Sequence, residues 1–259
     1  MNETEYAKMY EVEDTHWWYV SLHNLILRFV PRDVRALRIF DAGCGTGRLL
    51  QLLSAYGRVQ GCDASETALR YCRKRGLAAV VNDDLNTMAL PQEEYDVITS
   101  IDVLYHAGIR DELAVMRKLQ RALKPGGILI FQVPAYEWLR SNHDRAVHTR
   151  RRYQRTAVSA LLRDAGFVID KATYRVGFLL PPIALVRLSR RLFGKSGSTY
   201  GASDVKPAPK SINYLFGLIM RLENLMLKWT SFPAGTSVFV IARKPEPGYA
   251  RNICIKEWE

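Results

Sequence analysis

Short apolar runs alternate with amphipathic stretches through the first two thirds of the chain. Runs typical of strands occupy residues 37–41, 59–63, 78–81, 95–100 and 128–133. Patterns typical of helices lie between them at 47–56, 65–75 and 111–123, where Ser65 is placed to cap the second helix and Pro125 follows the third. This alternation predicts right-handed βαβ units and a doubly wound α/β sheet.

The pattern changes after Pro134. Residues 136–153 are polar, basic and aromatic, and they precede a predicted helix at 156–165 and predicted strands at 168–174 and 237–242. About sixty residues separate these last two strands, far more than in a usual connection. Helical patterns at 183–193 and 214–229, joined by a Gly-, Ser-, Lys- and Pro-rich segment at 194–211 that we expect to be a mobile loop, indicate a helical insertion.

Composition places the chain among ordinary globular proteins. Of its 259 residues, 48% are apolar and 24% charged, which excludes the disordered and low-complexity classes. No segment approaches the roughly 18 uninterrupted apolar residues of a membrane span, and the acidic N-terminus is unlike a signal peptide. The four cysteines, Cys44, Cys62, Cys72 and Cys254, form no CxxC pair and no metal-binding spacing. We therefore expect reduced thiols in a cytoplasmic protein.

The net charge of +11 is concentrated in one part of the chain. Thirteen Arg or Lys residues and three Asp residues lie between Trp138 and Lys195. Such a segment favours an anionic partner: a phosphorylated substrate, an acidic membrane surface or nucleic acid. The alternative is a basic face that contacts only solvent.

A glycine-rich turn follows the first predicted strand and opens the first predicted helix. Its sequence is DAGCGTG at residues 41–47, where glycines permit a tight turn and the close approach of a ligand. Asp63 ends the next strand, where a carboxylate can accept hydrogen bonds from ribose hydroxyls. The spacing is GxGxG rather than the dinucleotide GxGxxG, and the Asp41 carboxylate favours a cationic sulfonium amino acid over a pyrophosphate. We therefore expect a nucleoside cofactor here rather than a nicotinamide dinucleotide or a purely structural turn.

Together with later segments, this turn resembles the class I S-adenosylmethionine-dependent methyltransferases. The matching segments are FDAGCGTG at 40–47, Asp63, DL at 84–85, YDVI at 95–98 and RALKPGG at 121–127. The resemblance implies a Rossmann-like, seven-stranded, mostly parallel sheet whose last strand is antiparallel, with the helical insertion between strands six and seven. It also implies S-adenosyl-L-methionine as the cofactor.

The resemblance further implies roles for individual positions. The methionine moiety would lie against the glycine turn at Asp41, Gly43, Cys44 and Gly45, and Asp63 at the end of strand two would bind the ribose. The adenine would lie against Ala64, Leu85 and either Asp84 or its neighbour Asp83. Ser100 and Ile101 of strand four would lie beneath the acceptor site.

A narrower resemblance, to one subgroup of these enzymes, depends on three other segments. They are HWWY at 16–19, HDRAVHTRRRY at 143–153 and FPAGTS at 232–237. Some members of that subgroup are associated with lipid-linked or surface-glycan pathways, so this resemblance suggests a lipid-like acceptor.

A base is needed when the methyl acceptor is a hydroxyl or an ammonium group, and histidine suits this role near neutral pH. His106 follows strand four at the edge where parallel sheets bind ligands, so it is the first candidate, with a structural helix-capping role as the alternative. The loop after strand five adds further candidates, and its spacing does not favour a metal site. The catalytic candidates are His106, His143, Asp144, His148 and Tyr153. The substrate-binding candidates are Trp18, Tyr19, Arg151 and Arg152, whose guanidinium groups suit phosphate or carboxylate.

We expect four parts along the chain. Residues 1–35 form an N-terminal helical lid, 36–174 the methyltransferase core, 175–235 a helical insertion or cap, and 236–259 the last strand and tail. The aromatic and apolar residues of 17–29 fit either a lid over the acceptor or a stripe packed on the sheet. The basic, apolar insertion fits a cap over the acceptor, a homodimer interface or peripheral contact with an anionic membrane.

The sequence thus predicts methyl transfer from S-adenosylmethionine to a small or lipid-like, anionic acceptor. RNA methylation and a non-catalytic, cofactor-binding scaffold are the alternatives. Nucleic acid is the less favoured partner, because residues 100–103 read SIDV where enzymes that methylate exocyclic base amines carry an Asn/Asp-Pro-Pro-aromatic block. The sequence also shows no separate RNA-binding module.

Overall fold

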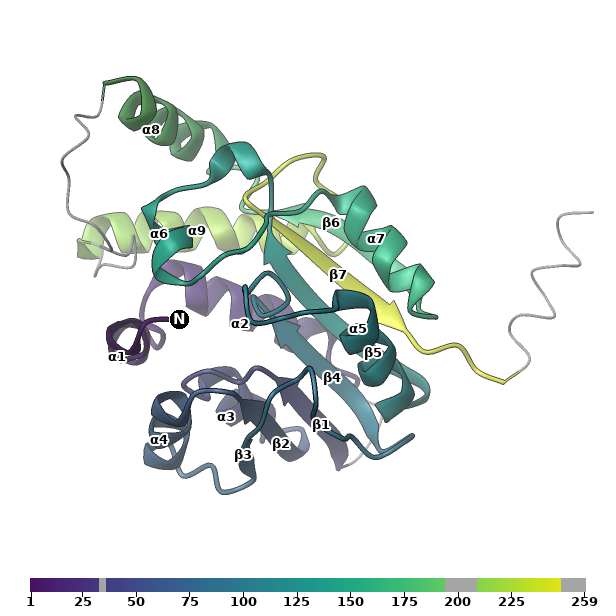
Figure 1. Ribbon diagram of the computed structural model, residues 1–259. Helices are drawn as coiled ribbons and strands as arrows, with labels where there is room; N and C mark the ends of the chain where they lie inside the picture. Colours follow the sequence, from purple (N-terminus) through teal and green to yellow (C-terminus); the bar gives the residue numbers. More distant parts are fainter. Residues whose placement is uncertain (33–35, 194–208, 248–259) are drawn as a thin grey trace, which may run out of the picture.

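The computed structural model describes residues 1–32, 36–193 and 209–247 (Figure 1). Its centre is a seven-stranded sheet in the order β3-β2-β1-β4-β5-β7-β6. Neighbouring strands among β1 to β5 are parallel, whereas β7 runs antiparallel to both β5 and β6. The mostly parallel sheet with an antiparallel last strand, which the resemblance implied, is confirmed.

The seven strands fall where the apolar runs predicted them. They are β1 (Leu37–Ala42), β2 (Gly57–Asp63), β3 (Val80–Asn82), β4 (Tyr95–Ile101), β5 (Leu123–Pro134), β6 (Val168–Arg175) and β7 (Ser237–Arg243). The largest difference is at β5, which begins at Leu123 rather than Ile128. Leu123 already pairs with Tyr95, ahead of an irregularity in the register, so the strand continues through the segment that we expected to end the preceding helix.

Helices cover both faces of the sheet (Figure 1). They are α1 (Glu3–Val12), α2 (Trp17–Phe29), α3 (Arg48–Leu53), α4 (Glu66–Lys74), α5 (Glu112–Ala122), the 3₁₀ turn η1 (Glu137–Leu139), α6 (Asn142–Ala146), α7 (Arg155–Asp164), α8 (Leu180–Phe193) and α9 (Lys210–Met226). Apolar side chains of α5 and α7, among them Met116 and Leu162, pack on one face. Those of α2 and α3, together with Leu227 after α9, pack on the other.

The N-terminal region contains two helices with different surroundings. On α2, Leu22, Leu25 and Ile26 are buried against the sheet, which is the packing role that we left as an alternative to a lid. The preceding α1 lies within the helical region expected at 1–35, although its sequence is polar and has no clear apolar face. The lid expected at 1–35 stays a prediction: α1 lies over the glycine turn, and α2 both packs on the sheet and lines the cavity with Trp18 and Tyr19.

The helical insertion between β6 and β7 is present and consists of α8 and α9. Helix α9 lies beside α2, where the Asn224 side chain donates a hydrogen bond to the Ser21 carbonyl at 2.7 Å. The loop predicted at 194–211 falls mostly outside the described residues, and its end belongs to α9 instead. Cys254 also lies outside them. Among the helices that the structure describes, none is long and apolar enough to cross a membrane.

Candidate active site

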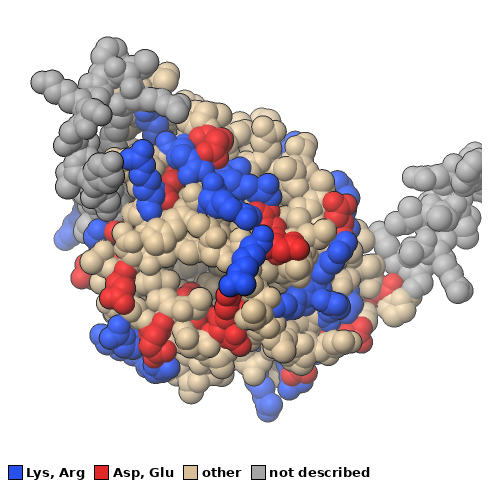
Figure 2. Space-filling model, in the orientation of Figure 1, with Lys and Arg blue, Asp and Glu red and all other residues tan. Residues whose placement is uncertain are grey.

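A large cavity opens at the carboxyl ends of β1, β2 and β4, the edge where parallel sheets bind ligands. Its volume is about 1230 Å³, larger than the roughly 300–1,000 Å³ of most ligand pockets, so two ligands can fit side by side. Figure 2 shows a hollow on this face of the molecule, with basic side chains along one side and acidic ones along the other. The glycine turn, α1, the start of α2, the loop after β4 and the start of α8 all contribute to its lining.

The glycine turn has a conformation that only glycine adopts easily. Gly43, Gly45 and Gly47 all have positive φ angles, of 85°, 54° and 83°. A Cβ atom added at Gly43 would lie 2.3 Å from a methyl carbon of Val103. The turn is fixed to β2 because the backbone N–H of Gly45 donates to the Asp63 carboxylate at 3.0 Å. The same carboxylate accepts from the N–H of Ser65 at 2.9 Å, so this turn and Asp63 form one unit at the cavity wall.

Asp41 is a buried carboxylate that has no cationic partner in the part of the chain that the structure describes. Its side chain accepts one hydrogen bond, from the Thr99 hydroxyl at 2.6 Å. Burial raises the pKa of Asp41 to about 7, and the nearby Asp63 carboxylate adds to this effect. Because Asp41 also lines the cavity, the ammonium group of a sulfonium amino acid would supply the missing positive charge. The residues present therefore fit the cofactor that the resemblance implied.

The predicted adenine-binding residues lie together at the cavity wall, whereas one other predicted cofactor-binding residue lies elsewhere. Ala64, Asp83, Asp84 and Leu85 all line the cavity, as does Ile101. The Asp84 carboxylate accepts hydrogen bonds from the backbone and side-chain nitrogens of Asn86 at 2.9 and 2.6 Å. Ser100 on β4 is almost fully buried and does not line the cavity. This placement corrects the expectation that Ser100 flanks the cofactor.

Helix α1 closes over the glycine turn. The Tyr6 hydroxyl lies 3.5 Å from the Asp63 carboxylate, and Met9 lies against Gly45. Just after the helix, the buried Glu13 carboxylate accepts a hydrogen bond from Thr46 at 2.5 Å and pairs with Arg75 at 2.7 Å. These contacts make α1 part of the cavity wall, a contribution that its polar sequence did not signal.

His106, the predicted base, uses both ring nitrogens within the protein. Its Nδ1 accepts from the backbone N–H of Gly108 at 3.0 Å, and its Nε2 lies 3.0 Å from the Met1 amino group. Burial, together with the Met1 ammonium and His148, lowers the pKa of His106 to about 4. The His148 ring is 5.6 Å away and bonds to Asn2, and unlike His106 it does not line the cavity. This geometry favours the structural alternative for His106, and it places the His148 side chain outside the cavity.

The loop after β5 is organised by a buried ion pair. Arg152 donates to both oxygens of Asp144, at 2.8 and 3.1 Å, and also to the Ala135 carbonyl. Burial alone would raise the pKa of Asp144, but the Arg152 guanidinium more than offsets this, so the pKa lies below its ordinary value. His143 lines the cavity next to this pair. Within the described ranges, no group of three or more His, Cys, Asp or Glu residues could hold a metal ion.

Three other residues of this loop pair with Glu112 at the start of α5. Arg150 and Arg151 each form an ion pair with one of its oxygens, and the Tyr153 hydroxyl donates to it at 2.8 Å. Tyr153 is buried, and neither it nor Arg151 lines the cavity. The predicted catalytic role of Tyr153 and substrate-binding role of Arg151 are therefore corrected to positions that hold the loop in place. The expected anionic acceptor also loses much of its basis, because Arg151 and Arg152 are already paired.

The sequence interpretation missed Asp102, the first residue after β4. It lines the cavity near Trp18 and Tyr19, and its backbone has a positive φ of 54°, which is rare outside glycine. One carboxylate oxygen accepts from the Gln132 amide at 2.8 Å. Burial raises the pKa of Asp102 to about 6. Its position directly after β4, the criterion that selected His106, could have identified it.

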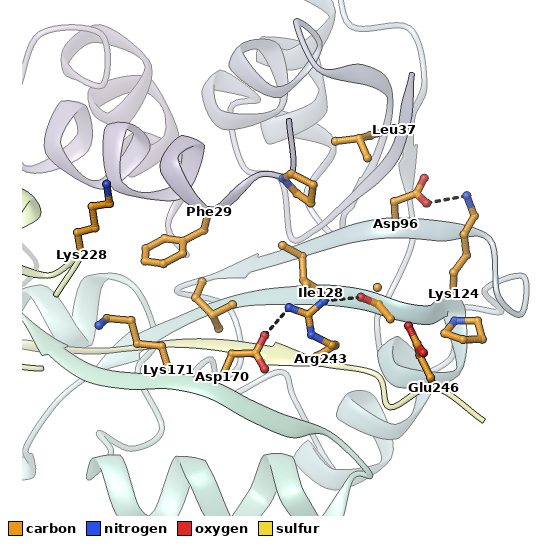
Figure 3. Close-up of a pocket in the computed structure, with 15 residues that line it drawn as sticks. Phe29, Leu37, Asp96, Lys124, Ile128, Asp170, Lys171, Lys228, Arg243 and Glu246 are labelled. Carbon is orange, nitrogen blue, oxygen red and sulfur yellow. Dashed lines mark hydrogen bonds and ion pairs between the residues drawn. The ribbon is translucent and has the colours of Figure 1, made fainter. Parts of the chain in front are cut away.

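A second pocket, of about 570 Å³, lies at the opposite end of the sheet (Figure 3). There Lys124 pairs with Asp96 at 2.7 Å, and Arg243 pairs with Asp170 at 2.8 Å. It borders the amino ends of β4 and β5, away from the edge where parallel sheets bind ligands. None of the predicted site residues lies in it, so the candidate active site is the larger cavity.

Comparisons with known proteins identify the family of the chain. A family model described as a methyltransferase domain matches residues 15–172, more than half of the chain. The chain is 37% identical over 113 residues to "Probable tRNA methyltransferase 9B" of Homo sapiens, which covers 43% of this chain and 24% of that protein. It is 25% identical over 185 residues to "Ubiquinone biosynthesis O-methyltransferase" of Hydrogenovibrio crunogenus, which covers 60% of this chain and 76% of that protein. The match to the tRNA methyltransferase relatives thus spans only about a quarter of their length.

Solved structures share the fold. A S-adenosylmethionine-dependent methyltransferase from Mesorhizobium loti aligns with a TM-score of 0.58 and 19% identity, covering 89% of this chain and 99% of the other. Phosphoethanolamine N-methyltransferase 2 of Haemonchus contortus, in complex with S-adenosyl-L-methionine, aligns with a TM-score of 0.55 and 21% identity, covering 88% and 53%. The predicted cofactor class is confirmed by the family match. The chain belongs to the methyltransferase-domain family and has the fold of the S-adenosylmethionine-dependent enzymes.

Proposed function

We propose that this enzyme transfers a methyl group from S-adenosylmethionine to a hydroxyl or amino group of a small, largely apolar acceptor. The observation that carries the proposal is the cavity beyond the glycine turn. Its walls there are aromatic and aliphatic, and a carboxylate stands among them. The lining residues in this part include Trp17, Trp18, Tyr19, Leu22, Asp102, Val103, Tyr105, Val176, Leu179 and Phe216.

The cofactor would occupy the side of the cavity next to β1 and β2. The backbone of Gly43 and Gly45 would lie along its methionine moiety, Asp41 would pair with its ammonium group and Asp63 would accept from its ribose hydroxyls. Ala64, Leu85 and one of the carboxylates Asp83 and Asp84 would meet the adenine, with Cys44 and Ile101 alongside. When bound, the cofactor supplies an electrophilic methyl group on a sulfonium centre.

The protein's own contribution is to align the acceptor, exclude water and remove a proton. Trp18 and Tyr19 from α2 and Tyr105 after β4 wall off the acceptor side of the cavity, which keeps the reacting atoms dry. Asp102 takes the proton of the acceptor hydroxyl or ammonium as the general base, since a base with a pKa near 6 is mostly ionised at neutral pH. We propose Asp102 for this role in place of His106, whose two nitrogens are already engaged.

RNA is the second candidate acceptor, supported by the 37% identity to a tRNA methyltransferase and by the basic side chains beside the hollow in Figure 2. Two observations favour the small acceptor. The match covers 76% of the ubiquinone O-methyltransferase but only 24% of the tRNA enzyme. In addition, Arg150, Arg151 and Arg152 pair with carboxylates of this chain, which leaves them less available for phosphates.

The first test is calorimetry of S-adenosylhomocysteine binding to the wild type and to Asp63→Ala. Binding by the wild type, weakened by the substitution, supports the cofactor site; no binding by the folded wild type refutes it. The second test adds labelled S-adenosylmethionine to a cell extract and separates organic-soluble, RNA and protein fractions. Label in the organic-soluble fraction, lost in Asp102→Asn while cofactor binding persists, supports the small acceptor. Label confined to RNA refutes it.

A further inference from the structure

Large apolar side chains are exposed mainly on the helical insertion. Of fourteen such residues in the described part of the chain, eleven lie on α8, on α9 or in the turn after α9. A patch of this extent on a soluble protein usually marks a binding surface. We therefore expect this patch to contact a binding partner.

The apolar residues of α9 form a stripe along one face. Tyr214, Leu218, Leu222, Leu225 and Trp229 follow one another at intervals of three or four residues, the repeat of a helix face. All five are exposed, Leu222 to 55% and Trp229 to 81%. Aromatic residues thus stand at both ends of the stripe, with leucines between them.

The opposite face of α9 is fixed to the body of the protein, so the stripe cannot turn inward. Met220 and Glu223 are fully buried. The Glu223 carboxylate accepts three hydrogen bonds, from the backbone N–H groups of residues 176, 177 and 178, at 2.6 to 3.1 Å. Asn213 near the start of the helix accepts from the N–H of Trp17 at 2.8 Å.

Basic residues accompany the stripe without an exposed acid. Lys210, Arg221 and Lys228 are all exposed and are spaced by eleven and seven residues, about three and two helical turns, so they follow one flank of the stripe. Glu223 is the only acidic residue between 210 and 229, and it is buried. A second copy of the chain docked on this face would bring like charges together with no carboxylate between them. Anionic lipid headgroups would neutralise the same charges.

We propose that the outer face of α9 binds the surface of an anionic lipid bilayer. The leucines and Trp229 enter the boundary between headgroups and acyl chains, and the basic flank contacts the headgroups. On the neighbouring α8, Val186 is 47% exposed and also lines the active-site cavity, so apolar surface on the insertion extends to the cavity rim. The binding does not depend on the proposed reaction, because it requires neither cofactor nor turnover.

The test is flotation of the full chain with vesicles of phosphatidylcholine containing about one third phosphatidylglycerol, compared with phosphatidylcholine alone. We expect the wild type to float with the anionic vesicles and to be released by high salt. Leu222→Glu and Trp229→Glu should each weaken binding about tenfold or more, because a buried apolar contact becomes a charge repelled by the lipid. Val81→Glu is the matched control for Leu222→Glu, since Val81 is similarly exposed (48% against 55%) but lies on β3, and it should float like the wild type.

Circular dichroism and binding of S-adenosylhomocysteine establish that each variant is folded. Absence of wild-type flotation, or flotation of Leu222→Glu equal to that of the wild type, overturns the proposal. So does a dimer in sedimentation experiments that Leu222→Glu dissociates, because the face would then belong to a second copy. If the wild type binds vesicles but does not bind S-adenosylhomocysteine, the proposed membrane-binding face is supported and the proposed function is refuted.

Discussion

Replacing Asp41 by Asn should make the protein without cofactor more stable and at the same time weaken cofactor binding. In the structure the Asp41 carboxyl is buried beneath the glycine turn, with the Thr99 hydroxyl as its hydrogen-bond donor. An asparagine keeps an oxygen to accept that bond but carries no charge. The substitution therefore isolates what the negative charge does at this position.

The size of the effect follows from the pKa. Burial raises the pKa of Asp41 from 3.8 to about 7, and each unit corresponds to about 1.4 kcal/mol, so ionised Asp41 destabilises the fold by at most about 4 kcal/mol. The folded state holds the proton more tightly than the unfolded state, so the stability due to protonated Asp41 is present at low pH. It is lost as the pH rises from about 4 through 7. After relaxation around the new amide, we expect Asp41→Asn to be about 1–3 kcal/mol more stable than the wild type near pH 8.

The assay is urea unfolding of both proteins without cofactor, between about pH 5 and pH 8. The difference in unfolding free energy should be largest near pH 8 and should shrink toward pH 5, where Asp41 is neutral and resembles Asn. Calorimetry near pH 8 should show S-adenosylhomocysteine binding about tenfold to a hundredfold weaker, because the ligand ammonium loses a charged partner. Asp170→Asn, at an exposed carboxylate far from the cavity, should change neither quantity. A stability difference independent of pH, or unchanged ligand affinity, would refute this reasoning.

Three more outcomes are expected. Glu112→Gln removes the charge that two arginines and a tyrosine share. It should lower the unfolding free energy by about 1–3 kcal/mol in urea, because it breaks ion pairs with two partly exposed arginines and weakens the bond from the buried Tyr153 hydroxyl. Gly43→Ala places a Cβ atom 2.3 Å from Val103 and should abolish S-adenosylhomocysteine binding in calorimetry, whereas unchanged affinity would contradict the observed turn. Glu13→Ala should speed dissociation of the same ligand about tenfold in stopped flow, because α1 loses its bonds to Thr46 and Arg75, while Glu11→Ala on the exposed side of α1 should not.

The strands and the glycine turn could be predicted because local sequence alone determines them. A central parallel strand is buried on both faces, so residues 128–133 are apolar throughout, and a turn with positive φ angles needs glycines, so 43, 45 and 47 are glycines. The register irregularity that starts β5 at Leu123 could not be predicted, because it depends on pairing with Tyr95, far away in sequence.

The roles of the polar loop residues could not be predicted, because they depend on which charges meet in space. The sequence favours Arg151 as a contact for a substrate anion, but in the structure Glu112, thirty-nine residues earlier, lies beside it. The sequence favours His106 as a base, but its Nδ1 accepts a hydrogen bond from a neighbouring backbone N–H. For Asp102 only the position was predictable: it directly follows β4, whereas its burial and its left-handed backbone come from the packing there and have no local sequence signature.

Comparing the acidic residues of this chain shows where a positive charge is missing. Glu13, Glu112 and Asp144 each have an arginine partner, so their charges are balanced within the protein. Among the described residues, no such ion pair reaches Asp41, Asp63 or Asp102, and these three carboxylates all line the same cavity, at the carboxyl ends of β1, β2 and β4. The Met1 ammonium near Asp63, and Arg175 and Arg152 near Asp102, offset this negative charge only in part. The remainder is costly in such surroundings and persists where a ligand can offset it. A sulfonium amino acid carries an ammonium and a sulfonium charge against one carboxylate, a net positive charge, so this cavity is suited to it by charge as well as by shape.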